Sequence, residues 1–253
     1  DAISKMIPDL FEKQKIYLYE YPTVYTVGGR RKPEVNTAIK NAINQGTLVI
    51  NFSGHGNPRI WTHEAVFVRE TDIPLLNNKG KYFFLVAATC NYSNFDLIDE
   101  QSSGEILVAM PDAGAIAVFS ATRAVYADAN FYLNRALYNY ILDTTSNGRI
   151  KEQRLGDIIY RTKQERSGDN DRKFFLLGDP ALRLSIPRMP VAVDSVNQLS
   201  ANQIVSLRAL SHAKVKASVR DTLTYSQLDF TGNAQFVVFD ANKKVTITEP
   251  ERN

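Results

Sequence analysis

The stretch TLVINFSGHGNPRIWTHEAVFVRETDIPLLNNKGKYFFLVAATCNYSNFD, residues 47–96, contains two apolar runs that each end in a reactive side chain. The first run, residues 48–52, leads to His55 between two glycines, and the second, residues 82–88, leads to Cys90, the only cysteine in the chain. Continuous apolar runs are typical of strands that are covered on both faces of a parallel sheet. Ligands bind beyond the carboxyl ends of such strands. We therefore expect His55 and Cys90 to lie together at one edge of a sheet.

The flanking sequence alternates further strands and helices, which predicts an α/β fold with a mainly parallel sheet and helices on both sides. A buried stripe from Val35 to Ile43 predicts a helix that begins at Pro33 and ends at Gly46. Ser102 and Glu105 match a capping box. The predicted helices cover residues 33–45, a short turn near Ile73, 102–110, 128–142 with Asp128 as its cap, and 154–166. The predicted strands cover residues 15–20, 48–52, 82–88, 115–120 and the region 174–186, and residues 21–32 are expected to be irregular.

The pattern changes after Pro190 to short alternating runs, which are typical of half-buried antiparallel strands. We therefore expect an α/β domain over residues 1–190 and an all-β, immunoglobulin-like domain over residues 191–253. The predicted strands cover residues 191–196, 204–207, 213–219, 235–239 and 245–248. An immunoglobulin-like sandwich has roughly seven strands, so this second domain is expected to be incomplete.

Bulk composition narrows the classes of function. The chain has 253 residues and a formal charge of +3, without a dense basic cluster, so we expect no nucleic-acid partner. The sequence contains no run of 18 apolar residues, so no membrane span is predicted. The single cysteine excludes an internal disulfide framework. Asp1 begins no signal peptide, and the sequence there resembles the interior of a longer protein.

A thiol beside an imidazole is a familiar catalytic pair, because the imidazole promotes the reactive thiolate. His55 could act as the base for Cys90, and Gly54 and Gly56 would let the backbone turn sharply. The backbone amides of Gly56 and Cys90 could then form an oxyanion hole. The alternative is that Cys90 is an inert core residue and that His55 is unrelated to it.

Other chemistries match the sequence less well. His63-Glu64 begins like a zincin helix, but Phe67 stands where the second histidine is required. A phosphatase loop would need an arginine at Asp96, and Ser53 lacks the frame of a nucleophile elbow. A metal site made of His55, His63, Glu64 and Cys90 matches no standard ligand spacing.

Several phrases resemble the gingipain-type cysteine peptidases, which have a caspase-like fold, and the more specific resemblance is to the PorU-type sortase, the C-terminal signal peptidase of the type IX secretion system. The resemblance covers about residues 1–190. The phrases are FSGHG (52–56), AATCNYSNFD (87–96), AIAVFSATR (115–123), LLGDPALRL (176–184), GRRKPEVNTAIKNAINQG (29–46), GHGNPRIWTHE (54–64), FYLNRALYN (131–139) and KFFLLGDPALRL (173–184).

The resemblance implies a three-layer α/β/α domain in which Cys90 is the nucleophile and His55 the general base, with the Gly56 and Cys90 amides as oxyanion hole. It implies that residues 122–126 shape the substrate pocket, with Arg123 and Tyr126 as candidate pocket residues. Trp61 is a further candidate for packing over the site, and the alternative is that it is a core residue.

Two expectations concern what the chain lacks. The acid that orients the histidine in this family is expected upstream of Asp1, and Glu20 and Glu34 are the nearby alternatives in the chain. A caspase-like sheet also needs more strands than the sequence predicts for residues 1–190. We therefore expect the chain to be the C-terminal part of a longer enzyme, and such a fragment could be inactive.

The resemblance implies a cysteine endopeptidase or transpeptidase that removes the C-terminal sorting signal from secreted proteins. Its acyl-enzyme would pass to water or to an amine. It would act at the cell surface or outer membrane of a Gram-negative bacterium, with secreted substrates and an outer-membrane protein as partners, and without a cofactor, although structural calcium stays open. The alternative is a non-catalytic scaffold or partner-binding subunit of a secretion complex.

Overall fold

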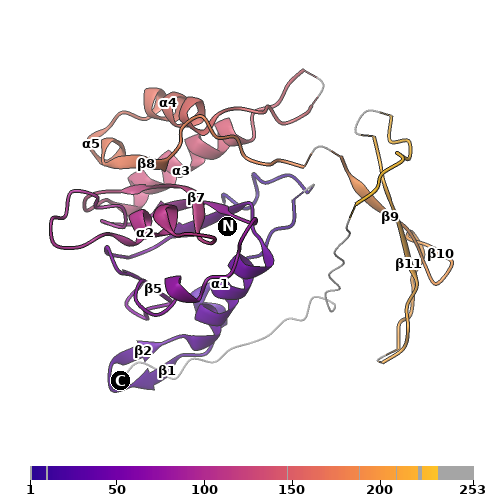
Figure 1. The fold of residues 1–253 in the computed structure, drawn as a ribbon, viewed down its shortest axis with the longest axis horizontal. Helices are drawn as coiled ribbons and strands as arrows, with labels where there is room; N and C mark the ends of the chain where they lie inside the picture. Colours follow the sequence, from indigo (N-terminus) through magenta and orange to yellow (C-terminus); the bar gives the residue numbers. More distant parts are fainter. Residues whose placement is uncertain are drawn as a thin grey trace. The chain divides into compact units, whose positions relative to one another are not determined.

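The computed structural model describes residues 2–9, 11–146, 148–187, 189–208, 210–221 and 224–232 (Figure 1). By their internal contacts these residues form two compact units, one ending at Ser185 and the other beginning at Ile186. Among the described residues, no helix is both long and apolar enough to span a membrane.

The first unit is built on a four-stranded sheet with the order β3-β6-β7-β8. Its strands are β3 (Val49–Ser53), β6 (Phe83–Ala88), β7 (Ala115–Ala121) and β8 (Phe174–Gly178). The first three are mutually parallel, and β8 runs antiparallel to β7. Between β7 and β8 the chain runs through three helices, at residues 127–141, 155–165 and 169–172. β8 then starts beside the end of β7, where Phe174 pairs with Ala121, and therefore runs in the opposite direction. The predicted mainly parallel sheet is thus confirmed, with one reversed strand.

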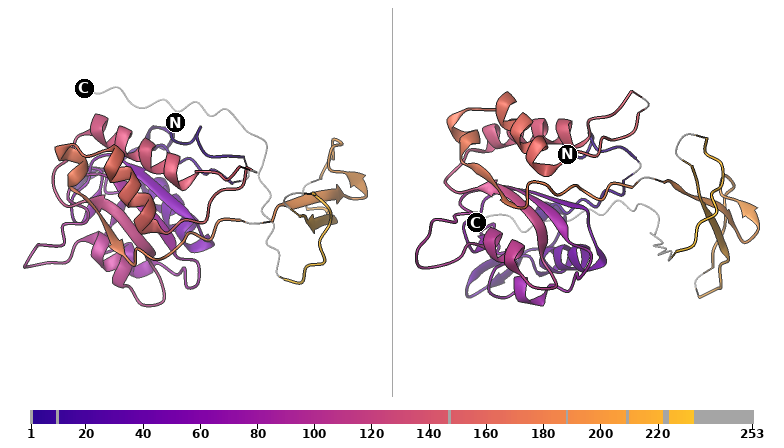
Figure 2. Two further views of the ribbon diagram at one scale, coloured as in Figure 1. Left: turned by 90° about the horizontal axis from the view of Figure 1, so that it is seen from above. Right: turned by 45° about the horizontal axis from the view of Figure 1, so that its top comes forward.

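Helices cover both faces of this sheet (Figures 1 and 2). On one side lie α1 (Pro33–Gln45) and α2 (Ser103–Ala109), and on the other lie α3 (Ala127–Ile141), α4 (Leu155–Glu165) and the short α5 (Asp169–Arg172). All six residues of β6 are buried, as a strand covered on both faces should be. The core on the α1 side includes Val35, Ile43, Phe83, Leu85 and Leu107.

Several predicted boundaries are confirmed by the local chemistry. Pro33 is the first residue of α1, and Gly46 follows its end with φ of 105°, a conformation that favours glycine. Ser102 and Glu105 form both bonds of the predicted capping box. The short helix near Ile73 is a 3₁₀ turn, Ile73–Leu75.

Two local predictions near the start of the first unit, at residues 15–20 and 21–32, are wrong. Residues 15–20 form no strand; Ile16 and Leu18 pack partly buried against the core, and the chain then makes a 3₁₀ turn, Leu18–Glu20. The alternating pattern there reflects packing rather than pairing. Residues 21–32, expected to be irregular, contain a hairpin made of β1 (Val24–Thr26) and β2 (Gly29–Arg31).

Two helix and strand ends also differ from the prediction. Asp128 lies inside the first turn of α3, and Tyr126 is the cap residue. After β8, Arg183 makes only an isolated bridge with Arg154 within the described part of the chain, in place of the expected closing strand.

The second unit contains an antiparallel sheet of three strands with the order β10-β9-β11. These are β9 (Val191–Val196), β10 (Leu199–Ser200) and β11 (Val215–Val219). The strands predicted at 191–196 and 213–219 are present, and residues 204–207 form no strand. The strands predicted at 235–239 and 245–248 lie outside the described residues. An immunoglobulin-like domain over residues 191–253 stays a prediction.

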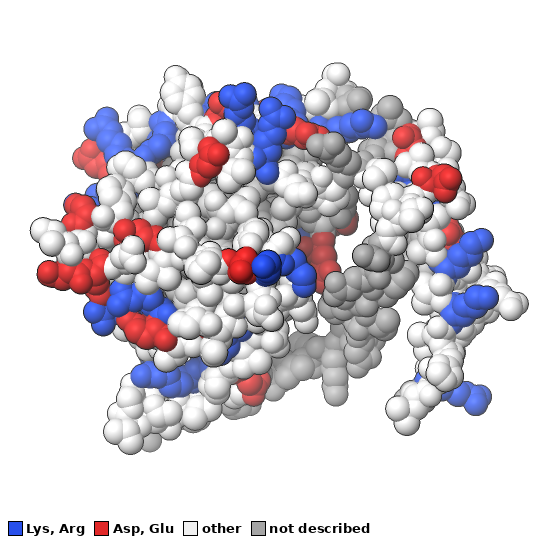
Figure 3. Space-filling model, viewed as in Figure 1, with Lys and Arg blue, Asp and Glu red and all other residues white. Residues whose placement is uncertain are grey.

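Charged side chains of both signs are interspersed on the face of the molecule that Figure 3 shows. This distribution accords with the small net charge of +3. The absence of a nucleic-acid partner stays a prediction.

Candidate active site

The parallel pairing of β3 and β6 brings the predicted base and nucleophile to neighbouring positions. Ser53 lies opposite Ala88 in the register, and the Gly54 N–H donates to the Ala88 carbonyl at 3.5 Å. His55 and Cys90 each follow two residues after this last pair. His55 is exposed and Cys90 is half-buried, so both side chains are accessible at the carboxyl edge of the sheet.

Gly56, the glycine after His55, lets the His55 loop approach the Cys90 loop closely. A Cβ atom on Gly56 would lie 2.6 Å from Thr89 Oγ1 and 3.1 Å from the Ile60 carbonyl oxygen, so it would collide with the hydroxyl and crowd the carbonyl. The His55 loop therefore packs directly against the residue that precedes Cys90. The Thr62 N–H donates to the His55 carbonyl at 2.9 Å and fixes the loop from its other side.

The predicted oxyanion donors are unengaged. No acceptor among the described residues is hydrogen-bonded to the backbone N–H of Gly56 or of Cys90. Buried or half-buried amides are normally paired with an acceptor, with water or with a ligand. These two N–H groups are therefore available to a bound group.

The Cys90 thiol hydrogen-bonds the loop after β7. Its Sγ receives the Val125 N–H at 3.4 Å and donates to the Val125 carbonyl at 3.5 Å. Within the part of the chain that the structure describes, the thiol forms no hydrogen bond with the His55 imidazole, and the ring of His55 lies 5.5 Å from that of His63 between centroids. Catalytic hydrogen bonds are often formed only when substrate is bound.

The first turn of α2 joins the two loops that carry His55 and Cys90. The Ser103 N–H and Oγ donate to the Pro58 carbonyl at 2.8 and 2.7 Å, and Pro58 follows His55 by three residues. The Gly104 N–H donates to the Tyr92 carbonyl at 3.0 Å on the Cys90 side. Ser103 and Gly104 are buried, so this junction is shielded from solvent.

A charged cluster reinforces the same junction, and we call Arg59, Arg69, Glu70 and Glu100 the loop ion cluster. Glu100 follows Cys90 in the chain and pairs with Arg59, whose Nε lies 2.7 Å from Oε2, and with Arg69 at 3.1 Å. Arg69 also pairs with Glu70 at 2.7 Å. The hydrogen bond from Arg59 and a second from Arg69 lower the pKa of Glu100. Sequence reasoning missed this cluster, because its charges are spread over two loops and match no motif.

The three residues predicted to bind substrate lie in different environments. Trp61 is 2% exposed and stacks on Phe52 with centroids 4.2 Å apart, so it belongs to the core and the prediction that it packs over the site is wrong. The short hairpin of β4 (Ile60–Trp61) and β5 (Phe67–Val68) turns its side chain inward. Tyr126 is 74% exposed at the start of α3, with the Lys173 ammonium 5.8 Å from its ring centroid.

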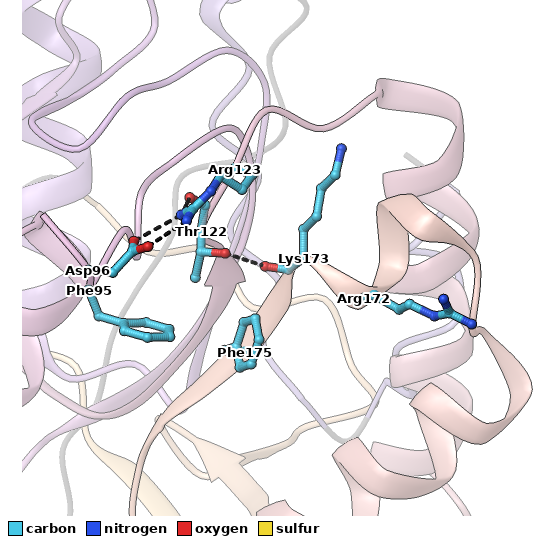
Figure 4. A pocket seen from close by; sticks show the side chains of 7 residues that line it. All are labelled: Phe95, Asp96, Thr122, Arg123, Arg172, Lys173 and Phe175. Atoms are coloured by element: carbon cyan, nitrogen blue, oxygen red, sulfur yellow. Dashed lines mark hydrogen bonds and ion pairs between the residues drawn. The ribbon is translucent and has the colours of Figure 1, made fainter.

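Arg123 lines a shallow hollow of about 320 Å³ at the same edge of the sheet (Figure 4). Its guanidinium forms two hydrogen bonds with the carboxylate of Asp96, one of them at 2.9 Å. The hollow is lined by Phe95, Asp96, Thr122, Arg123, Arg172, Lys173 and Phe175.

Among the described residues, no acid takes the position expected to orient His55. Glu20 and Glu34, the alternatives in the chain, are exposed at the 3₁₀ turn and in the first turn of α1. Across the described ranges, no carboxylate forms a hydrogen bond or ion pair with the His55 ring. No three His, Cys, Asp or Glu side chains among these residues are grouped so that they could hold a metal ion.

Comparison with known proteins places this geometry in a family. The model of peptidase family C25 matches residues 1–185. Lys-gingipain HG66 of Porphyromonas gingivalis is 26% identical over 96 residues, which are 38% of this chain and 5% of that protein.

Solved structures agree at the level of the fold. The crystal structure of the Arg-specific cysteine proteinase gingipain R has a TM-score of 0.51 at 20% identity, covering 62% of this chain and 39% of that chain. The complex of Porphyromonas gingivalis RgpB pro- and mature domains has a TM-score of 0.50 at 18% identity, covering 62% and 40%. The chain thus spans well under half the length of the relatives that it matches. Because the family model matches most of its length, the chain belongs to peptidase family C25, the gingipain-type cysteine peptidases.

Proposed function

We propose that the whole protein is a cysteine endopeptidase or transpeptidase in which Cys90 is the nucleophile and His55 the general base. The observation that carries this proposal is the parallel register of β3 and β6, which sets His55 and Cys90 two residues beyond the paired Ser53 and Ala88. Membership in peptidase family C25 supports the same class of reaction.

The residues support a two-step acyl transfer. His55 takes the Cys90 proton when the thiol turns away from the Val125 carbonyl, and the thiolate attacks the scissile carbonyl. The free N–H groups of Gly56 and Cys90 receive the developing oxyanion, and one such donor contributes roughly 10²–10³ in rate. The protonated His55 then gives its proton to the leaving amine, which leaves an acyl-Cys90 intermediate.

The substrate that the PorU-type resemblance supports is a secreted protein with a C-terminal sorting signal. The acyl group passes to water or to an amine nucleophile, and the enzyme works at the cell surface or outer membrane beside an outer-membrane protein partner. Mass spectrometry of the mature cargo distinguishes the two acceptors, because only the amine leaves an added group on the new C-terminus.

The experiment that tests the proposal follows cargo processing in cells that carry the full-length protein with Cys90→Ala or His55→Ala. Loss of a catalytic nucleophile lowers a peptidase rate by about 10⁶-fold in a comparable enzyme. We expect cargo to keep its C-terminal signal in both variants at unchanged protein abundance. Normal processing with Cys90→Ala would overturn the proposal.

A non-catalytic scaffold is the second candidate, and one observation favours it. The Cys90 thiol is hydrogen-bonded to Val125 on both its donor and acceptor sides and is not bonded to His55. A scaffold would tolerate Cys90→Ala, and would lose function only when a contact surface is changed.

A further inference from the structure

If the proposed peptidase function holds, a substrate bound at Cys90 can reach the hollow, which is lined in part by the loop that follows Cys90. Its walls come from that loop, from the two residues after β7, and from the residues before β8 together with Phe175 of β8. These segments meet where β7 ends and β8 begins. The Asn91 N–H donates to the Arg123 carbonyl at 3.3 Å, and Val125 contacts the Cys90 thiol. Because the strand order is β3-β6-β7-β8, the hollow lies on the side of Cys90 away from His55.

Asp96 is the one carboxylate among the residues that line this hollow, and it is occupied. Arg123 Nη1 bonds Oδ1 at 2.9 Å and Nη2 bonds Oδ2. Nη1 is also held by Asn94 Oδ1 at 2.9 Å and by the Thr122 carbonyl at 2.8 Å, so the guanidinium is fixed in its place. A lysine or arginine side chain of a substrate would therefore find no free carboxylate.

The remaining cations of the hollow also disfavour a basic side chain, and they are not arranged to bind an anion. The Lys173 ammonium donates to the Ala124 carbonyl at 2.8 Å. Arg172 Nη1 lies 3.7 Å from Asp169 Oδ1, and the Arg172 side chain points away from the hollow in Figure 4. Neither directs a free charge at the centre of the hollow.

What the hollow offers is aromatic surface. The rings of Phe95 and Phe175 meet edge to face with centroids 5.4 Å apart, and they are 46% and 43% exposed (Figure 4). Covering exposed aromatic surface with an apolar group is favourable, because it removes apolar area from water. An uncharged apolar side chain therefore complements the hollow better than a charged one.

We infer that this hollow receives an apolar substrate side chain next to the scissile bond, and that Arg123 sets this specificity by masking Asp96. The inference rests on the proposed peptidase function and names the class of substrate side chain for that site. Removal of the Arg123 guanidinium exposes the Asp96 carboxylate and makes the hollow acceptable to lysine or arginine.

The test measures kcat/KM of the full-length protein on fluorogenic peptides that carry Phe, Leu, Lys, Arg or Asp on each side of the scissile bond. We expect the wild type to cleave Phe and Leu peptides at least about tenfold faster than Lys and Arg peptides, a discrimination of the size that side-chain pockets give. Arg123→Met should raise cleavage of Lys and Arg peptides about tenfold. The double variant Arg123→Met with Asp96→Asn should lose that gain, and Phe175→Ala should lower cleavage of Phe peptides.

Two results would overturn the inference: a wild-type preference for Lys, Arg or Asp, or an Arg123→Met protein that cleaves Phe peptides yet gains nothing on Lys and Arg. Failure of the proposed function has a different signature, which is cleavage of no peptide by the wild type at any position. The wild-type preference tests the apolar character of the hollow without any variant. Retained cleavage of Phe peptides shows that the Arg123→Met protein is folded, so its result on Lys and Arg peptides tests the masking of Asp96.

Discussion

At the scale of residues, the site depends on how closely two short loops approach each other. Thr89 and Gly56 are in contact only because Gly56 has no side chain. His55 directly precedes Gly56, and Cys90 directly follows Thr89. The contact between Gly56 and Thr89 therefore sets the position of His55 relative to Cys90. A sequence of Gly-His-Gly therefore has a packing reason as well as a conformational one.

Gly56→Ala should destabilise the protein, since its Cβ would overlap Thr89 Oγ1 and crowd the Ile60 carbonyl. Overpacking of this kind costs about 1–3 kcal/mol in the free energy of unfolding. Urea denaturation of the wild type, Gly56→Ala and the double variant with Thr89→Ala measures it. Because Thr89→Ala removes the nearer contact, it should recover part of the loss; a double variant no more stable than Gly56→Ala would contradict this packing.

At the scale of elements, α2 connects the two loops that carry His55 and Cys90. Ser103 bonds the loop after His55, while Gly104 bonds the loop after Cys90. A Cβ on Gly104 would lie 2.4 Å from Ser93 Oγ, so the helix start lies directly against the Cys90 loop. The sequence predicts only the capping box at the start of this helix. The contacts of the helix with the His55 loop and the Cys90 loop are seen only in the fold.

Ser103→Ala and Ser102→Ala form a matched pair for this junction. Ser103→Ala removes a buried hydrogen bond to Pro58, which costs about 0.5–1.5 kcal/mol. Ser102→Ala removes the helix cap, which costs about 1 kcal/mol, without touching Pro58. If α2 positions the His55 loop, Ser103→Ala should lower kcat with little change in KM, whereas Ser102→Ala should leave kcat unchanged. Equal effects on kcat would reduce the junction to a purely structural role.

The loop ion cluster predicts a pH dependence of stability. Hydrogen bonds from Arg59 and Arg69 lower the pKa of Glu100 in the folded protein. A lowered folded-state pKa stabilises the fold above the pKa of the unfolded chain, and this contribution is lost as the pH falls through the folded value. Glu100→Gln should therefore reduce stability at neutral pH and have no effect in strong acid.

Denaturant titrations at a series of pH values measure this difference. Glu12→Gln is the control, since Glu12 is exposed and forms no ion pair with another described residue. At neutral pH the control should change stability less than Glu100→Gln does, because it removes no described ion pair. A Glu100→Gln curve parallel to that of the wild type would show that the cluster contributes nothing.

At the scale of the whole molecule, the parts that the sequence predicted well are those governed by burial on two faces. The runs at β3, β6 and β7 and the stripe of α1 are read directly from apolar periodicity. The reversal of β8 could not be read from the sequence, because apolar periodicity indicates a strand but not its direction. The strand predicted at residues 15–20 failed because Ile16 and Leu18 alternate for packing against the core.

The candidate site residues, like the strands, were predicted where a continuous apolar run marks a buried strand. His55 and Cys90 were identified from the ends of their strands, and the register of β3 and β6 brings them together. Trp61 was misplaced because sequence shows a large aromatic near the loop and does not show the short β4–β5 hairpin that turns it inward. The Arg123–Asp96 pair joins residues far apart in the chain, so no local pattern reveals it.

Trp61→Ala tests the corrected role of this residue. Trp61 packs on Phe52, Phe67 and Tyr92 within the core shared by α1, α2 and the sheet. Removal of such a side chain costs about 3–5 kcal/mol in the free energy of unfolding, measured by denaturant titration. In the remaining folded protein KM should stay close to the wild-type value. A raised KM without loss of stability would return Trp61 to the substrate site.

The central claim is that His55 activates Cys90, and the rate of Cys90 alkylation by iodoacetamide in the full-length protein tests it most directly. Cys90 is the only cysteine among these 253 residues, and the full-length Cys90→Ala variant supplies the background rate. We predict that the thiol reacts faster than free cysteine at pH 6, where an unassisted thiol is almost fully protonated. We also predict that His55→Ala removes this advantage, whereas His63→Ala does not. A Cys90 rate equal to that of free cysteine and unchanged by His55→Ala would contradict the account.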